Sequence, residues 1–312
     1  MLSPYKPEGY LIGTPENHEV LSSLPGIEKA IEKQKILESV ALVCDSSYNL
    51  HFDLYGIPAV MPRSEVQSTR NGEEVKDIAV LTRVGKPVAF TIIGIKRDEN
   101  GKTVAVLSRR RAQEECRRRY IDGLLPGDIL PATVTHLENF GAFVDIGCGI
   151  VSLLSIDSIS VSRITHPRDR LRVGDRIRVV VKNIDAEGRL YVSQRELYGT
   201  WKENAARFHA GDTVAGIVRS IENYGIFVEL APNLAGLAEL KDNVEVGDVA
   251  AVYIKSIIKE KMKIKLVIID TEGRPERNAS PKYFVDTAKV THLSSWRYSP
   301  ENCPKVIETV FD

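Results

Sequence analysis

An eight-residue motif that occurs twice limits the architecture more than any other feature of the sequence. Residues 139–146 read NFGAFVDI and residues 223–230 read NYGIFVEL. A Gly-Asp pair precedes each motif at the same distance, at 127–128 and 211–212. An internal repeat indicates that each copy is one structural unit. The chain is therefore predicted to consist of small domains in tandem.

In both copies of the motif, the side chains alternate as in a half-buried β-strand, with every second side chain on the same face. On the outer face we expect Phe143 with Asp145 in the first copy, and Phe227 with Glu229 in the second. The inner face is apolar in both copies and is expected to enter the core of its domain. Its members are Ala142, Val144, Ile146, Ile226, Val228 and Leu230.

The outer face carries aromatic side chains where polar ones are ordinarily found. Phe140 stands three residues before Phe143, and Tyr224 stands three residues before Phe227, so each copy places two rings on the solvent side. Flat rings left in water are typical of surfaces on which nucleobases stack, and each stacked base contributes roughly 1–3 kcal/mol. The alternative is that a connecting helix or a neighbouring domain covers these rings.

Length and composition allow several domains and exclude some functions. The chain has 312 residues, 43% of them hydrophobic, and its 42 basic side chains balance 42 acidic ones. Any affinity for nucleic acid must therefore come from local patches and from stacking. The four cysteines form no Cys-x-x-Cys pair, and no apolar stretch approaches the roughly 18 residues of a membrane helix. We expect a cytoplasmic protein without metal, cofactor or membrane association.

Strand runs and turn signals divide the chain into seven segments. We expect a mainly β protein of three tandem five-stranded OB-type barrels joined by short helices, with the first barrel degenerate. In the tail, Ser299-Pro300 predicts a short final helix that reaches Phe311. The predicted segments are an N-terminal extension with a short helix at 1–35, barrels at 36–109, 125–196 and 210–270, connecting helices at 110–124 and 197–209, and a tail at 271–312.

The middle domain also carries a charged hairpin. Gly188 permits a tight turn that brings the carboxylate of Asp185 close to the guanidinium of Arg189. An arginine that is already paired is already oriented, so it loses less side-chain entropy when it grips a phosphate or stacks on a base. The alternative is an ordinary surface ion pair, which contributes little to stability.

The middle domain resembles the RNA-binding domain that is repeated in ribosomal protein S1 and also found in polynucleotide phosphorylase. The resemblance implies an OB-type barrel that contacts RNA through Phe140, Phe143, Asp185 and Arg189. The residues that carry it are Gly127-Asp128, Phe140-Gly141-Ala142-Phe143-Val144, Ser152-Leu153-Leu154-Ser155-Ile156, Val173-Gly174-Asp175, Asp185 with Arg189, and Val192-Ser193. Tandem copies in small number resemble the short form of the protein in low-GC Gram-positive bacteria.

The sequence departs from the family pattern at one RNA-contacting position of the middle domain. The family's histidine falls on Ser155, which can hydrogen-bond but cannot stack, and His136 on the preceding strand is a candidate to compensate. In the irregular segment of the same domain, Arg163 and Arg168 are further candidates for contact with RNA.

The other two domains match the family more thinly. The third keeps the aromatic turn but replaces the Asp/Arg hairpin by a lysine-rich stretch, in which Lys255 and Lys263 are candidates to follow phosphates without planar specificity. In the first, Tyr48 and His51 fall where the middle domain has its two phenylalanines.

The resemblance implies a non-enzymatic protein that binds single-stranded RNA in translation, holding messenger RNA near the small ribosomal subunit. The sequence contains no nucleophile–base pair, metal cluster or phosphate-binding loop, which disfavours an enzyme or a small-molecule substrate. Two alternatives stay open. One is an RNA regulatory or decay factor that acts away from the ribosome, and the other is a protein-interaction scaffold.

Overall fold

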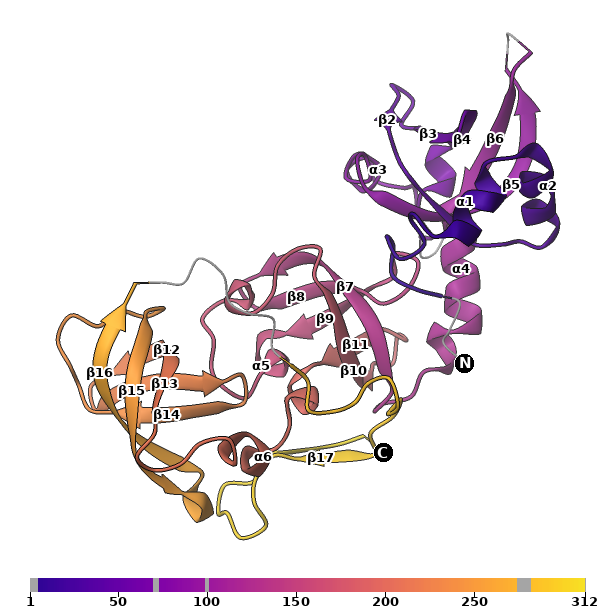
Figure 1. Ribbon diagram of the computed structural model, residues 1–312. Helices are drawn as coiled ribbons and strands as arrows, with labels where there is room; N and C mark the ends of the chain where they lie inside the picture. Colours follow the sequence, from indigo (N-terminus) through magenta and orange to yellow (C-terminus); the bar gives the residue numbers. More distant parts are fainter. Residues whose placement is uncertain (1–4, 70–72, 99–100, 274–281, 312) are drawn as a thin grey trace. The chain divides into compact units, whose positions relative to one another are not determined.

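The computed structural model describes residues 5–69, 73–98, 101–273 and 282–311, and the protein is mainly β (Figure 1). It divides into two compact units, of which the first comprises Met1–Leu124 with Asp145–Val151 and the second Leu125–Val144 with Ser152–Asp312. The second unit contains two closed five-stranded barrels, and the first contains a related open sheet. The predicted fold class is confirmed. No helix in the described ranges is long and apolar enough to cross a bilayer.

The sheet of the first unit departs from the prediction, because it has six strands and does not close. Its order is β1-β5-β6-β4-β3-β2. Ala41-Leu42 separates β1 from β2, so β1 pairs with β5 while β2 pairs with β3. The strands are β1 (Leu37–Val40), β2 (Val43–Cys44), β3 (Leu50–Leu54), β4 (Ile57–Met61), β5 (Pro87–Arg97) and β6 (Thr103–Ser108).

Short helices surround this sheet. The predicted N-terminal helix is present as α2 and buries Ile27 and Ala30 against the sheet, but α1, which Thr14 caps, was not predicted. The elements are α1 (Pro15–Leu21), α2 (Leu24–Glu32), η1 (Arg63–Glu65), α3 (Asp77–Leu81), α4 (Arg109–Arg119) and η3 (Ile121–Gly123).

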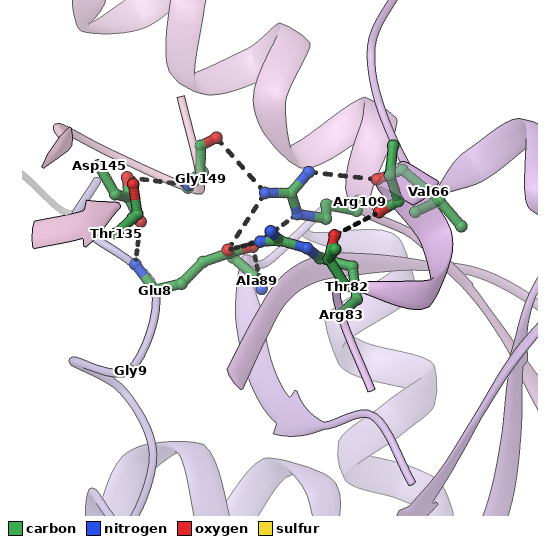
Figure 2. A network of polar contacts seen from close by, with 12 residues as sticks. Glu8, Gly9, Val66, Thr82, Arg83, Ala89, Arg109, Thr135, Asp145 and Gly149 are labelled. Atoms are coloured by element: carbon green, nitrogen blue, oxygen red, sulfur yellow. Dashed lines mark hydrogen bonds and ion pairs between the residues drawn. The ribbon is translucent and has the colours of Figure 1, made fainter. Parts of the chain in front are cut away.

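A buried polar network holds the N-terminal segment in the first unit, as Figure 2 shows. The Glu8 carboxylate accepts from Arg109 Nε at 2.6 Å, and its backbone N–H donates to Asp145 Oδ2 at 2.7 Å. Arg109 also donates to the Gly149 carbonyl. The prediction that Asp145 faces solvent is therefore wrong, since this network covers it. Burial, and then the charge of Glu8, raise the pKa of Asp145 to about 7.

The middle barrel closes in the order β10-β11-β9-β8-β7. All five predicted strands are present, and Ala142 and Val144 lie in the barrel core. The first residue of β8, Gly141, must be a glycine because a Cβ at this position would lie 2.5 Å from the Leu154 carbonyl oxygen. The elements are β7 (Ile129–Glu138), β8 (Gly141–Asp145), β9 (Val151–Ser155), α5 (Ile156–Ile159), η4 (Pro167–Asp169), β10 (Arg176–Ile184) and β11 (Leu190–Ser193).

The third barrel closes in the order β12-β13-β14-β16-β15. Ile226 and Val228 enter its core as predicted, but Leu230 lies at a register shift in β13 and is only half-buried. The elements from the connector onward are η5 (Arg195–Tyr198), α6 (Trp201–Ala205), β12 (Thr213–Glu222), β13 (Gly225–Ala231), β14 (Leu234–Ala238), β15 (Val249–Ile258), η6 (Lys259–Lys261) and β16 (Lys263–Glu272).

A buried ion cluster joins the middle and third barrels inside the second unit. Glu229 is only 5% exposed, although its position on the outer face of β13 predicted exposure to solvent. Its carboxylate accepts from Arg219 Nε at 2.6 Å and from Arg170 Nη2 at 2.5 Å. Arg170 belongs to the segment between α5 and β10. The expectation that Glu229 faces water is wrong because that segment packs over it.

The tail forms a two-stranded sheet in place of the predicted final helix. Strand β17 (Ser295–Arg297) pairs antiparallel with β18 (Glu308–Val310). The Ser299 hydroxyl accepts from the backbone N–H of Ile307 at 2.9 Å and donates to the Lys305 carbonyl at 2.7 Å. These bonds turn the chain back on itself where the sequence predicted a helix cap.

Candidate nucleic-acid interface

Three aromatic rings gather on the outer face of the middle barrel. Phe140, in the turn between β7 and β8, is 55% exposed, and its ring centroid lies 6.0 Å from that of Phe143 at an interplanar angle of 89°. The Ile156 N–H donates to the Phe140 carbonyl and fixes the turn. His136 on β7 stacks on Phe143 at 6.3 Å. The structure therefore leaves Phe140 open to solvent, with a half-buried ring beside it.

The third barrel repeats this arrangement. Tyr224 is 65% exposed, and its ring lies 6.1 Å from that of Phe227, again at 89°. Gly225 is required for the same reason as its counterpart, because a Cβ there would lie 2.5 Å from the Ala238 carbonyl oxygen. Both barrels thus present a ring pair of the same geometry, held by the same kind of glycine turn.

The charged hairpin of the middle barrel is formed as its sequence predicts. Arg189 Nε lies 2.7 Å from Asp185 Oδ2, and the Arg189 backbone N–H donates to Asp185 Oδ1 at 2.9 Å. These two bonds, the backbone one first, lower the pKa of Asp185 to about 2. The Arg189 side chain is 53% exposed, so the guanidinium is oriented but still accessible.

This barrel also matches a known family. Residues 125–195 match the model of the S1 RNA binding domain. We refer to residues 125–195 as the S1 domain, after the family model that they match. The match confirms the resemblance inferred from the aromatic turn and the charged hairpin.

Curated relatives extend the similarity beyond the S1 domain. The small ribosomal subunit protein bS1 of Rhizobium meliloti is 28% identical over 237 residues, which are 72% of this chain and 39% of the relative. The bS1 homolog of Bacillus cereus is 29% identical over 202 residues, 62% of this chain and 50% of the relative. The bS1 of Mycolicibacterium smegmatis is 29% identical over 276 residues, 83% of this chain and 55% of the relative. The chain therefore spans about half of these relatives or less.

At the position of the family's histidine, the S1 domain has a chain of hydrogen bonds. Ser155 Oγ lies 2.9 Å from Ser158 Oγ, which also accepts from Lys182 Nζ at 3.1 Å. Lys182, which was not predicted as a site residue, stands at the register shift of β10, and a bulge of this kind re-aims a side chain. Lys255 stands at the corresponding shift of β15. Alignment of the two barrels strand by strand would have revealed Lys182.

The other candidate cations belong to segments of the sequence that do not carry the ring pairs. Arg163 and Arg168 are exposed on the segment between α5 and β10, the segment that also supplies Arg170 to the buried cluster. Lys263 is exposed at the start of β16, opposite Ile258. In the ranges that the structure describes, no group of three or more His, Cys, Asp or Glu side chains is gathered as a metal site would need.

The first unit does not present a comparable ring pair at the matching positions. Tyr48 is half-buried, and the guanidinium of Arg63 lies 5.1 Å from the centre of its ring. His51 pairs with Asp45 at 2.8 Å. A hydrogen bond to Asp77 raises the pKa of the Tyr48 hydroxyl. Both side chains that correspond to the phenylalanines of the S1 domain thus contact other residues of their own unit.

Proposed function

We propose that the chain binds single-stranded RNA without changing it chemically, and that the S1 domain is its principal RNA-binding site. The observation that carries this proposal is the ring pair of Phe140 and Phe143, whose geometry Tyr224 and Phe227 repeat. Because every base has a π face, two such pairs suit a strand that is bound with little sequence preference.

Two cations of the S1 domain support the same function. Arg189 is held in place by Asp185, and Lys182 donates to Ser158, which also accepts from Ser155. Each is a candidate to contact a phosphate while the bases stack. Since the net charge is zero, these local groups and not a global field must supply the electrostatic attraction.

The first experiment removes the stacking rings. We expect Phe140→Ala with Phe143→Ala to weaken the binding of a ten-nucleotide single-stranded RNA by roughly 2–5 kcal/mol, measured by fluorescence anisotropy. Phe284→Ala, which removes a 41% exposed ring from the tail, is the matched control and should bind as the unmodified protein does. Unchanged affinity in the double variant would show that the rings do not stack on bases.

The biological setting is a separate part of the proposal. The bS1 relatives are named as proteins of the small ribosomal subunit. We propose that this chain likewise acts in translation and holds messenger RNA near that subunit. Co-sedimentation with small subunits at moderate salt is the expected result. Persistent absence from that fraction, with RNA binding intact, would favour a regulatory or decay factor that acts off the ribosome.

A further inference from the structure

One row of paired residues crosses the outer face of the third barrel. Phe227 on β13 pairs with Leu237 on β14, and Leu237 pairs with Lys265 on β16. Directly paired residues project to the same face of a sheet, and neighbouring strands lie about 4.8 Å apart. Lys265, which is exposed, therefore stands roughly 10 Å from Phe227 on the same surface.

The S1 domain has an aromatic residue at the corresponding place. Leu153 on β9 pairs with Tyr191 on β11. The neighbours of Tyr191 in the strand, Leu190 and Val192, are buried in the barrel, so the half-buried Tyr191 projects outward. By the register of the third barrel, Tyr191 occupies the position of Lys265, two strands from Phe143.

The Tyr191 ring is held beside the charged hairpin. Its hydroxyl donates to Asp185 Oδ2 at 3.3 Å, and the same oxygen lies 2.7 Å from Arg189 Nε. One carboxylate thus orients both an aromatic ring and a guanidinium on the face that carries Phe143. A ring fixed in this way loses little freedom when a base packs on it.

We infer that this position decides how each barrel contacts RNA. Tyr191 gives the S1 domain a third stacking surface, whereas Lys265 gives the third barrel a contact to a phosphate. The inference rests on the proposed function and adds that the two barrels make different kinds of contact with RNA at this position. Stacking is insensitive to salt, but each phosphate contact releases counterions. At this position, the contact made by the third barrel should therefore weaken as the salt concentration rises, whereas the contact made by the S1 domain should not.

The test is a salt titration of the full chain with a ten-nucleotide single-stranded RNA. We expect Tyr191→Ala to weaken binding about fivefold to tenfold at every salt concentration, the low end for a stacked base because the ring is half-buried. Tyr191→Phe keeps the ring and should bind nearly as tightly as the unmodified protein. Lys265→Ala should lower the log–log salt slope by about 0.7, whereas Lys202→Ala, at an exposed position of α6, should not.

The outcomes separate the inference from the proposed function. Wild-type affinity in Tyr191→Ala, or an unchanged slope in Lys265→Ala, would overturn the inference even if the Phe140/Phe143 double variant binds poorly. Normal binding by that double variant would overturn the proposed function itself. If thermal melting shows that Tyr191→Ala does not fold, Tyr191→Lys takes its place. It should steepen the salt slope by about 0.7, and an unchanged slope there would also overturn the inference.

Discussion

At the scale of single residues, the Asp185–Arg189 pair serves orientation more than stability. The Arg189 side chain is half exposed, so water screens its attraction to the carboxylate and the pair contributes little to folding. In the proposed function, its value lies in holding the guanidinium in one orientation for contact with RNA. Sequence reasoning found this pair because its partners are four residues apart, on one hairpin. It did not find Tyr191 or Lys182, whose proposed contacts with RNA depend on the register between strands and on a bulge.

Arg189→Ala should weaken RNA binding less than the loss of both phenylalanines, because it removes one phosphate contact and no stacking surface. We expect the log–log slope of affinity against salt to become shallower by about 0.7. The measurement is the same anisotropy titration at several salt concentrations. A slope identical to that of the unmodified protein would mean that the Arg189 guanidinium does not touch the RNA backbone.

At the scale of strands, the alternating pattern predicted which face each side chain takes but not what covers that face. Asp145 and Glu229 both lie on outer faces, as expected, yet both are buried. The Asp145 carboxylate accepts from the backbone N–H of Glu8, 137 residues away, and Glu229 contacts Arg170, 59 residues away. No local pattern encodes such distant contacts. The predicted final helix was wrong for a related reason, since β18 forms only by pairing with β17, which lies before the predicted helix.

The strand β13 gives a stability prediction. Glu229 is the shared carboxylate of Arg170 and Arg219, whose side chains are 6% and 7% exposed. Glu229→Gln leaves two buried cations with less compensation, so we expect it to lower the free energy of unfolding by roughly 3–5 kcal/mol. Urea denaturation measures this change. Glu187→Gln, at an exposed partner of Arg189, is the control, and equal stability of the two variants would contradict the prediction.

At the scale of the whole molecule, the two units show different chemistry. The second presents two ring pairs on closed barrels, whereas the first uses its charged groups to hold its own N-terminal segment. In the first unit, Glu38 is 1% exposed and accepts from the backbone N–H groups of Gly9, Leu11 and Ile12. Burial outweighs these bonds and raises the pKa of Glu38 to about 7.

This buried carboxyl makes the stability of the first unit depend on pH. The folded state binds the Glu38 proton more tightly than the unfolded state, so the free energy of unfolding falls as the pH rises from about 4.5 to about 7. Glu38→Gln should remove up to about 3 kcal/mol of that fall in the free energy of unfolding. The pKa of Asp145 is also raised, so Asp145 should account for the pH dependence that remains in the variant. Urea unfolding at pH 5 and pH 8 tests this. Parallel pH profiles for variant and unmodified protein would refute it.

The most direct test of RNA stacking is an NMR titration of the full chain, labelled in its phenylalanine rings, with a ten-nucleotide single-stranded RNA. Bases that stack on Phe140 and Phe143 should shift the ring-proton resonances of these two phenylalanines upfield through ring currents. The ring resonances of Phe90, which is buried in the first unit, should not shift. RNA binding that leaves the Phe140 and Phe143 resonances in place would contradict the proposed interface.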